Sequence, residues 1–463
     1  MDFHVRFWKD DKVITRYIGS VFLGHGSADD LMHHFNEGIK DLPVHNIIQI
    51  SMDGPNVNLK FFEMIKKQIF NDHGVTLLNI GSCGLHVMHN SFKCGVQAST
   101  WDISSLMSSL YYLFKDSPAR REDYQKVSGS SVLPLKFVNH RWMENVGVVE
   151  RALLIWKNIE TYVKKVQEKE VNKPTCKSYE VVATMVKDPL VKAKMEFFRY
   201  IATHLQPFLG HYQTDRPMVP FLMADLGQLV RGLMSKVIKD DVMKEIGPES
   251  TQKLFALDID DKKNQVTYSK VDLGFSAAKE LRQAKVSDKQ SMEFKLQSKD
   301  FVLATLRKIM MKSPATYSVV RYLSMLNPKE MVSNPSLCKS RLKKCLGHFV
   351  SCGRVNERDC DCIIQQYDAL LLNIPSIGTS MFADFNPYLD RLDEFLMTHL
   401  KNQEFEKLRS FVKLCLVLSH GQADVERGFS VNKKVEVENL KEESVVAQRL
   451  ICDYVKNVGG IKK

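Results

Sequence analysis

The chain has 463 residues, of which 44% are hydrophobic and 26% are charged, as in an ordinary folded globular protein. No stretch reaches the roughly 18 consecutive apolar residues of a membrane span, and the N-terminus lacks the pattern of a secretory leader. We therefore expect a protein of the nucleus or cytoplasm, neither secreted nor inserted in a membrane. Lysine and arginine exceed aspartate and glutamate by 65 to 54, and the net charge of +11 suits nucleic acid as a partner. The alternative is a scattered, solvated basic surface, because no long basic block occurs.

The first 95 residues predict a mixed α/β segment. Residues Asp2–Trp8 and Val13–Phe22 have the pattern of a β-hairpin, with Lys9–Lys12 as its turn. A helix is expected over Asp29–Leu42, and the β-branched run Asn46–Met52 predicts a strand. These elements indicate that the chain opens with an α/β core.

An acidic residue stands where the strand Asn46–Met52 ends. Asp53 opens a turn-forming Asp-Gly-Pro-Asn sequence, and apolar residues at helical spacing follow from Val57. A carboxylate at a strand tip is well placed to bind a metal ion, whereas an isolated Asp in such a turn more often caps the next helix. A further short apolar strand, Leu77–Ile80, is expected before Cys83.

The region from Val96 to about Leu400 predicts helices almost throughout. Apolar residues at helical spacing, such as Val149, Leu153 and Trp156, mark amphipathic helices. The stretch 250–300 is more polar, and we expect it to contain loops. No fixed-period repeat occurs, which argues against a solenoid.

Ten cysteines without a secretory leader predict reduced thiols. Cys338, Cys345 and Cys352 are spaced seven apart, which places them on one helical stripe and not in the close pairs of a zinc knuckle. We expect them to be buried core residues. Cys83 and His86 cannot close a tetrahedral zinc site alone, and we expect them to help pack a strand against a helix.

The most informative run of the chain lies near its C-terminus, from Leu418 to Ser430. It contains the pair Glu426-Arg427, then Phe429 and Ser430. The run resembles the C-terminal signature of hAT-superfamily DNA transposases, in which the Glu is the last acid of a catalytic triad. The resemblance gives that place to Glu426 and makes Arg427, Phe429 and Ser430 motif residues.

Three other segments resemble hAT motifs in the same chain order. The segment that begins at Asp53 resembles the Asp-x-x-x-Asn segment with the second catalytic Asp. Cys83 and His86 match a Cys-x-x-His motif, and Arg141-Trp142 matches an Arg-Trp pair of the family. Each motif is weak alone, but four separated motifs in the right order are specific together.

The resemblance implies an α/β plus α fold, with an RNase H-like core interrupted by a large all-helical insertion. Residues 1–95 would begin the core, 96–400 would form the insertion, and 401–463 would complete the core and form a dimerisation region. The family's first catalytic Asp lies on a strand upstream of the hairpin. Here the hairpin already opens at Asp2, so the first strand is expected to be missing, and Asp2 is a poor substitute for its acid.

An incomplete triad predicts a loss of catalysis. Phosphodiester cleavage by this fold needs three carboxylates around two divalent cations. Asp53 and Glu426 would therefore bind Mg²⁺ or Mn²⁺ only in an active enzyme. We expect a vestigial site and no cofactor.

Arg141 and Trp142 could act without the catalytic site. In the family the matching Trp lies near the DNA end, where the ring can stack on an unpaired base while the Arg contacts phosphate. The alternative is a Trp that anchors a helix in the core.

The C-terminal segment carries an apolar stripe formed by Leu440, Val446, Leu450 and Tyr454. The resemblance makes this region a dimerisation segment, and such a stripe can pack on a second copy of the chain. The alternative is that the stripe covers the chain's own core.

Three functional hypotheses follow from these patterns. The first is a domesticated or truncated transposase-derived protein that binds nucleic acid, dimerises, or does both, without catalysis and with no small-molecule substrate evident. The second is an active metal-dependent transposase or nuclease whose first acid is missing from this gene model. The third is a helical scaffold for protein interactions.

Overall fold

A computed structural model of the chain describes residues 1–52, 54–247, 250–435 and 440–459, except for the side chains of residues 424, 430, 433 and 434. The structure divides into two compact units. Unit 1 comprises Met1–His86, His211–Leu226 and Lys312–Lys463, and unit 2 comprises Val87–Gly210 and Gly227–Met311. The expected boundaries at residues 95 and 400 differ from these, because the helices between residues 312 and 400 cluster with the N-terminal hairpin.

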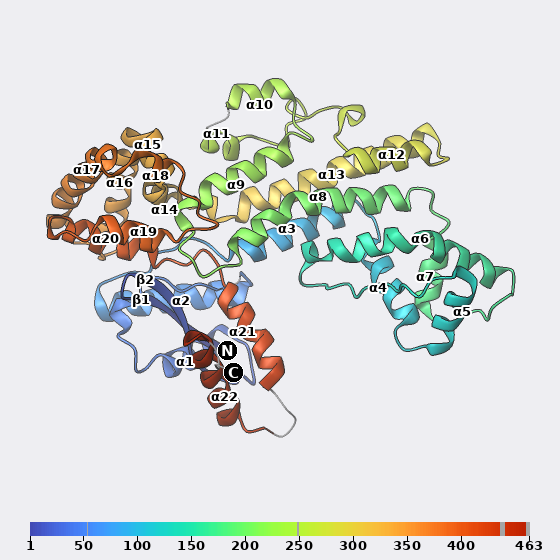
Figure 1. Cartoon of the computed structure of the whole chain (residues 1–463), viewed down its shortest axis with the longest axis horizontal. Coiled ribbons are helices and arrows are strands. Elements are labelled where there is room, and N and C mark those ends of the chain that lie inside the picture. Colours follow the sequence, from blue (N-terminus) through green and yellow to red (C-terminus); the bar gives the residue numbers. More distant parts are fainter. Residues whose placement is uncertain (53, 248–249, 436–439, 460–463) are drawn as a thin grey trace. The chain divides into compact units, whose positions relative to one another are not determined.

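Unit 1 opens with the expected β-hairpin, which the structure confirms. Strands β1 (Asp2–Lys9) and β2 (Lys12–Ser20) pair antiparallel (Figure 1). The two-residue turn between them has Asp10 at a φ of 54°, the positive value that tight hairpin turns require. This is the sole sheet in the described part of the chain, which is otherwise mostly helical.

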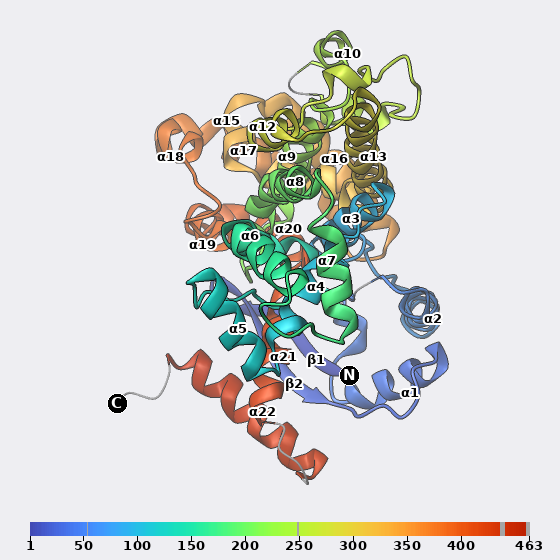
Figure 2. The same ribbon diagram turned by 90° about the vertical axis from the view of Figure 1, so that its right-hand side faces the viewer.

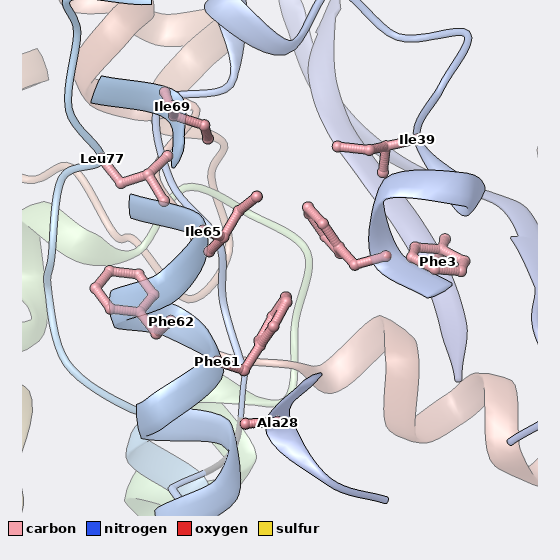
Figure 3. Packing of buried hydrophobic residues seen from close by; sticks show 9 residues of the cluster. Phe3, Ala28, Ile39, Phe61, Phe62, Ile65, Ile69 and Leu77 are labelled. Carbon is pink, nitrogen blue, oxygen red and sulfur yellow. The ribbon is translucent and has the colours of Figure 1, made fainter. Parts of the chain in front are cut away.

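Two helices pack their apolar faces together beside the hairpin. Helix α1 (Ala28–Gly38) begins at a capping box, and α2 (Asn56–His73) ends at Gly74 in the left-handed conformation. Figure 3 shows how side chains of the two helices converge. Helix α1 ends before the expected Leu42, at Gly38, where the ring of Phe3 occupies the space that a β-carbon would need.

The prediction of strands over 46–52 and 77–80 is wrong, because the structure assigns neither range to a β-strand. A short helix, η1 (Val44–Asn46), precedes the first of them, and Leu78 N–H donates to the Ile48 carbonyl at 2.8 Å. Arg354, 307 positions from Ile47, donates to the carbonyls of Ile47, His45 and Thr76. The guanidinium therefore occupies acceptors that a β-ladder would use.

The remainder of unit 1 is helical. Its helices are η4 (Pro314–Thr316), α14 (Ser318–Leu323), η5 (Ser324–Leu326), α15 (Pro328–Ser333), α16 (Pro335–Ser351), η6 (Glu357–Asp359), α17 (Cys360–Ile377), α18 (Thr379–Ala383), α19 (Leu392–His399), η7 (Gln403–Phe405), α20 (Glu406–Leu416), α21 (Ala423–Val435) and α22 (Glu442–Asn457). Cys338, Cys345 and Cys352 are buried along α16 and at its end, which confirms their expected place in the core.

Among its described residues, the regular elements of unit 2 are helices, apart from one isolated β-bridge. Its helices, some of which extend past the unit boundary, are α3 (Gly84–Ala98), α4 (Ile103–Phe114), α5 (Pro118–Ser128), η2 (Trp142–Asn145), α6 (Val146–Gln167), α7 (Lys177–Met185), α8 (Val191–Tyr212), α9 (Val219–Met234), α10 (Asp240–Ile246), α11 (Thr251–Ala256), η3 (Tyr268–Lys270), α12 (Phe275–Gln283) and α13 (Asp288–Lys312). The polar stretch 250–300 contains helices as well as the expected loops.

Aromatic residues form the centre of unit 2, where α3, α8 and α13 run side by side (Figures 1 and 2). The ring of Phe92 lies 4.8 Å from that of Phe198 and 5.3 Å from that of Phe301. Gly95 permits this approach, because a β-carbon there would lie 2.7 Å from the Phe301 carbonyl oxygen. Within the described ranges, no helix is both long enough and apolar enough to cross a bilayer.

Candidate functional site

The two ends of the sequence meet within unit 1 through a side-chain amide. Gln49 donates from Nε2 to the Ser419 carbonyl at 3.0 Å, and its Oε1 accepts from the Ser419 N–H at 2.7 Å. The two residues are 370 positions apart. This pair of hydrogen bonds, here called the Gln49–Ser419 clasp, joins the segment that leads to Asp53 with the segment that leads to Glu426.

Asp53 itself lies outside the described residues. Its neighbour Gly54 is described, and a β-carbon on Gly54 would lie 3.0 Å from Ser82 Oγ. The chain that follows Asp53 therefore passes directly beside Ser82, the residue before Cys83. The segments that carry the expected second acid and the Cys-x-x-His motif are neighbours.

Glu426, His86 and Cys83 form a compact cluster. Glu426 lies in the first turn of α21, and its Oε1 is 3.6 Å from His86 Nδ1. The thiol of Cys83, a ring nitrogen of His86 and a carboxylate oxygen of Glu426 all lie within 4.8 Å of one another. Cys83 is 1% exposed, while the other two side chains are partly exposed.

The start of α3 and a glycine explain how this cluster forms. Cys83 immediately precedes α3 (Gly84–Ala98), and His86 lies in its first turn, so the three-residue spacing turns both side chains to one side of the helix. The loop before α21 closes on the thiol at Gly421, where a β-carbon would lie 3.3 Å from Cys83 Sγ. A side chain at Gly421 would require the loop or Cys83 to shift by a few tenths of an ångström.

The donor atoms of this cluster do not fit the magnesium pair that the family resemblance implies. Mg²⁺ and Mn²⁺ favour oxygen ligands, whereas the described neighbours of Glu426 in the cluster are a thiol and an imidazole. Thiolate and imidazole are ligands that zinc-class ions prefer. Glu426 therefore lies in surroundings suited to a softer ion than phosphodiester cleavage by this fold employs.

Asp2, which could replace the missing acid, is engaged in holding the core together. Its carboxylate accepts hydrogen bonds from Ser20 Oγ at 2.6 Å and Asn432 Nδ2 at 2.9 Å. Arg449 Nη2 lies 3.8 Å from the same carboxylate, and both side chains are almost fully buried. Asp2 thus links the hairpin to α21 and α22.

The other residues of the C-terminal motif have separate environments. Arg427 donates from Nη1 to the Gln213 carbonyl at 3.0 Å. Phe429 is exposed on α21, and the side chain of Ser430 lies outside the described atoms. The motif residues therefore do not all point toward the Glu426 cluster.

Trp142 and Arg141 lie in unit 2, at the start of η2. Trp142 is 7% exposed, and its ring packs edge-on against Phe137 with the centroids 5.3 Å apart. Arg141 forms an ion pair with Glu144 at 3.3 Å. Stacking on a base would require Trp142 to leave this packing, so the structure favours the core-anchor alternative for the ring.

Helix α22 uses one face to contact the hairpin. Val445 and Arg449 are buried there, and the Arg449 guanidinium lies 4.5 Å from the Tyr17 ring centroid. Of the expected apolar stripe, Leu450 is 42% and Tyr454 62% exposed. The stripe therefore turns its C-terminal half away from the chain's own core.

The remaining two members of the stripe, Leu440 and Val446, are half-buried. Leu440 lies just before α22 and Val446 lies in its second turn.

A cavity of about 960 Å³ lies within unit 1, between the hairpin and the segment that leads to Asp53. One wall is formed by residues 1–8, which include most of β1, and another by residues 46–52. The chain around α21 supplies a third wall, and His86 also contributes to the lining. Strand β1 pairs with β2 alone among the described strands, so its other edge has no partner strand.

No protein-family model matches the sequence, and no curated protein matches it either. Sequence reasoning identified Cys83, His86 and Glu426 separately but missed that they form one set. It also missed Gln49, because no local pattern signals a partner 370 residues away.

Proposed function

We propose that this chain is an hAT transposase-derived protein that binds nucleic acid, forms homodimers, or does both, without catalysing DNA cleavage. The observation that carries the proposal is the Gln49–Ser419 clasp. It joins the segment just before the Asp53 motif to the start of the Leu418–Ser430 run, 370 positions away. An RNase H-like core divided by an insertion requires such a meeting of its first and last parts.

The cavity beside β1 supports the incomplete form of that core. An RNase H-like fold would place a further strand between the hairpin and the segment that leads to Asp53. In unit 1 these two walls enclose about 960 Å³, and β1 has a free edge among the described strands. The first catalytic Asp would belong to this additional strand.

Binding of nucleic acid is supported by charge and not by a defined surface. The excess of basic over acidic residues gives a net charge of +11. Contacts with phosphate release bound counterions, so the affinity should fall steeply with salt. The proposal places the chain in the nucleus or cytoplasm.

Homodimer formation is supported by α22. Leu450 and Tyr454 stay exposed although α22 packs its opposite face on the hairpin. Exposed apolar side chains on one helical face are typical of a surface that contacts another protein.

The free edge of β1 also favours one alternative, an active nuclease whose first acid enters with an added strand. The non-catalytic protein and the active nuclease predict opposite results in one assay on the purified chain. A nicking assay on supercoiled DNA with Mg²⁺ or Mn²⁺ should give no product under the proposal, because the described cluster around Glu426 supplies a thiol and an imidazole where a two-metal site needs further carboxylates. Nicking that is lost in Asp53→Asn and in Glu426→Gln would overturn it and support the enzyme.

Fluorescence anisotropy with labelled single-stranded and duplex DNA tests the binding function. We expect binding that weakens steeply between low and physiological salt. Arg141→Ala should weaken it if the family's DNA contact is retained, whereas Glu144→Gln, which removes the ion-pair partner of Arg141, should not. The binding function would be refuted by the absence of salt-dependent affinity for either form of DNA.

A further inference from the structure

We propose that Cys83, His86 and Glu426 form a binding site for a zinc-class divalent ion, with one coordination position left for water or an external ligand. The proposed function gives Glu426 a vestigial part in a magnesium site and gives Cys83 and His86 none. The new site instead follows from where the three side chains lie. Their ligand atoms are all within 4.8 Å of one another.

The geometry is close to that of a tetrahedral site. Zinc ligands lie about 2.0–2.3 Å from the ion, so neighbouring ligand atoms are about 3.5 Å apart. The His86 Nδ1 to Glu426 Oε1 distance is already 3.6 Å. Cys83 Sγ needs to approach by no more than about 1.3 Å, which side-chain rotation can supply.

The ligand types select the class of ion. Thiolate is a soft ligand and imidazole is intermediate, and together they favour Zn²⁺, Co²⁺ or Ni²⁺ over Mg²⁺ and Ca²⁺. The buried position of Cys83 adds to this preference, because a bound cation compensates a thiolate that would otherwise be costly to bury. Three protein ligands with a fourth position open is the arrangement of zinc sites that bind an exchangeable ligand.

The surrounding chain holds the three ligands in place. Cys83 and His86 are fixed at the start of one helix, and Glu426 is fixed in the first turn of another. The close approach of Gly421 to the thiol places the chain before the second helix against the start of the first, and the Gln49–Ser419 clasp fixes that same chain to the segment that leads to Asp53. The site is therefore largely formed before an ion binds.

A second cluster in the described chain provides an internal comparison. His33, His34 and Glu37 also have ligand atoms within 4.8 Å of one another, but they lie on α1, largely exposed and without a thiol. Ordinary divalent-ion affinity of surface side chains would appear there as well. A thiolate signature can come from the first cluster and not from the second.

Cobalt titration of the purified, reduced chain tests the proposal, because Co²⁺ bound by a thiolate gives a sulfur-to-metal charge-transfer band in the near ultraviolet. We expect one equivalent of Co²⁺ to produce the band and Zn²⁺ to displace it. Cys83→Ser should abolish the band, and Glu426→Gln and His86→Ala should each weaken Zn²⁺ binding by more than about tenfold. Cys94→Ser and the double variant His33→Ala/His34→Ala are the matched controls and should leave both signals unchanged.

Circular dichroism establishes that each variant is folded before titration. Because Cys83 is buried, His86→Ala and Glu426→Gln, whose side chains are partly exposed, test the site even if Cys83→Ser unfolds. The proposal is overturned if the folded wild-type chain shows no stoichiometric thiolate band. It is equally overturned if His86→Ala and Glu426→Gln bind Zn²⁺ as tightly as wild type.

Discussion

Replacing Gln49 should loosen α21 while leaving the rest of the chain intact. In Gln49→Leu the side chain keeps a similar size but loses both hydrogen bonds to Ser419. Each intramolecular hydrogen bond contributes about 0.5–1.5 kcal/mol, so the two together contribute about 1–3 kcal/mol. If the local opening of α21 costs about 1–3 kcal/mol less in Gln49→Leu than in wild type, it should occur about 5–150 times more often.

Hydrogen exchange followed by mass spectrometry measures this opening directly. Peptides that cover residues 419–432 should exchange faster in Gln49→Leu by that factor, and peptides from α16 should be unchanged. Gln68→Leu is the matched control, because the Gln68 amide also forms paired hydrogen bonds, with the Asn36 side chain between α1 and α2. It should speed exchange in α1 and α2 and not in α21. Equal protection of α21 in wild type and Gln49→Leu would refute a role of the clasp in holding Glu426.

Two further predictions concern a buried acid and the exposed end of α22. Burial raises the pKa of Asp225, while hydrogen bonds from Tyr212 and Tyr388 oppose the shift. A raised pKa means that the folded state binds the proton of Asp225 more tightly than the unfolded chain does. The stability gained from this tighter binding is fully present below the pKa of the unfolded chain and is lost as the pH rises through the folded pKa. Urea unfolding of wild type should therefore show the stability from this group falling as the pH rises above 3.8, the ordinary pKa of an aspartate, toward neutrality, and Asp225→Asn should reduce that fall; an unchanged pH dependence in Asp225→Asn would contradict the assignment. For α22, Leu450→Glu/Tyr454→Glu should convert a dimer into a monomer in analytical ultracentrifugation without loss of helix content, whereas the exposed Leu372→Glu on α17 should leave the mass unchanged. A wild-type chain that sediments as a monomer at all concentrations would refute the dimer.

The helices and strands whose formation depends on neighbouring residues could be predicted from the sequence. The hairpin follows from strand propensity on either side of an Asp-Asp turn, and α2 follows from apolar residues at helical spacing between a proline and a glycine. The stripe of cysteines on α16 is local in the same sense, because a spacing of seven keeps side chains on one helical face.

The conformation of residues 46–52 could not be predicted correctly, because it depends on a distant residue. The β-branched run favours a strand, but Arg354 takes the carbonyl of Ile47 and two other carbonyls near it. Trp142 was ambiguous for a similar reason. The sequence Arg-Trp is the same whether the Trp142 ring faces solvent or packs on Phe137. Only the tertiary structure shows which position the ring takes.

The candidate site was predictable as separate motifs and not as a set of ligands. The three-residue spacing of Cys83 and His86 indicates that both side chains lie on one side of a helical turn. Glu426 joins them only through packing between segments that lie hundreds of residues apart, which no periodicity records. The resemblance to hAT transposases predicts Asp53 as the partner of Glu426. The described geometry places a thiol and an imidazole beside Glu426.

The two proposals place different demands on Glu426. A magnesium pair needs further carboxylates around it, whereas a zinc-class ion needs the thiol and imidazole that lie beside it. An ion that binds only the folded state stabilises it by about 2.7 kcal/mol when its concentration is 100 times its dissociation constant. That is comparable to the upper estimate for the Gln49–Ser419 clasp, and both interactions join the chain around α21 to the N-terminal part of unit 1. A carboxylate with no part in DNA cleavage would therefore still contribute to holding the first and last parts of the core together.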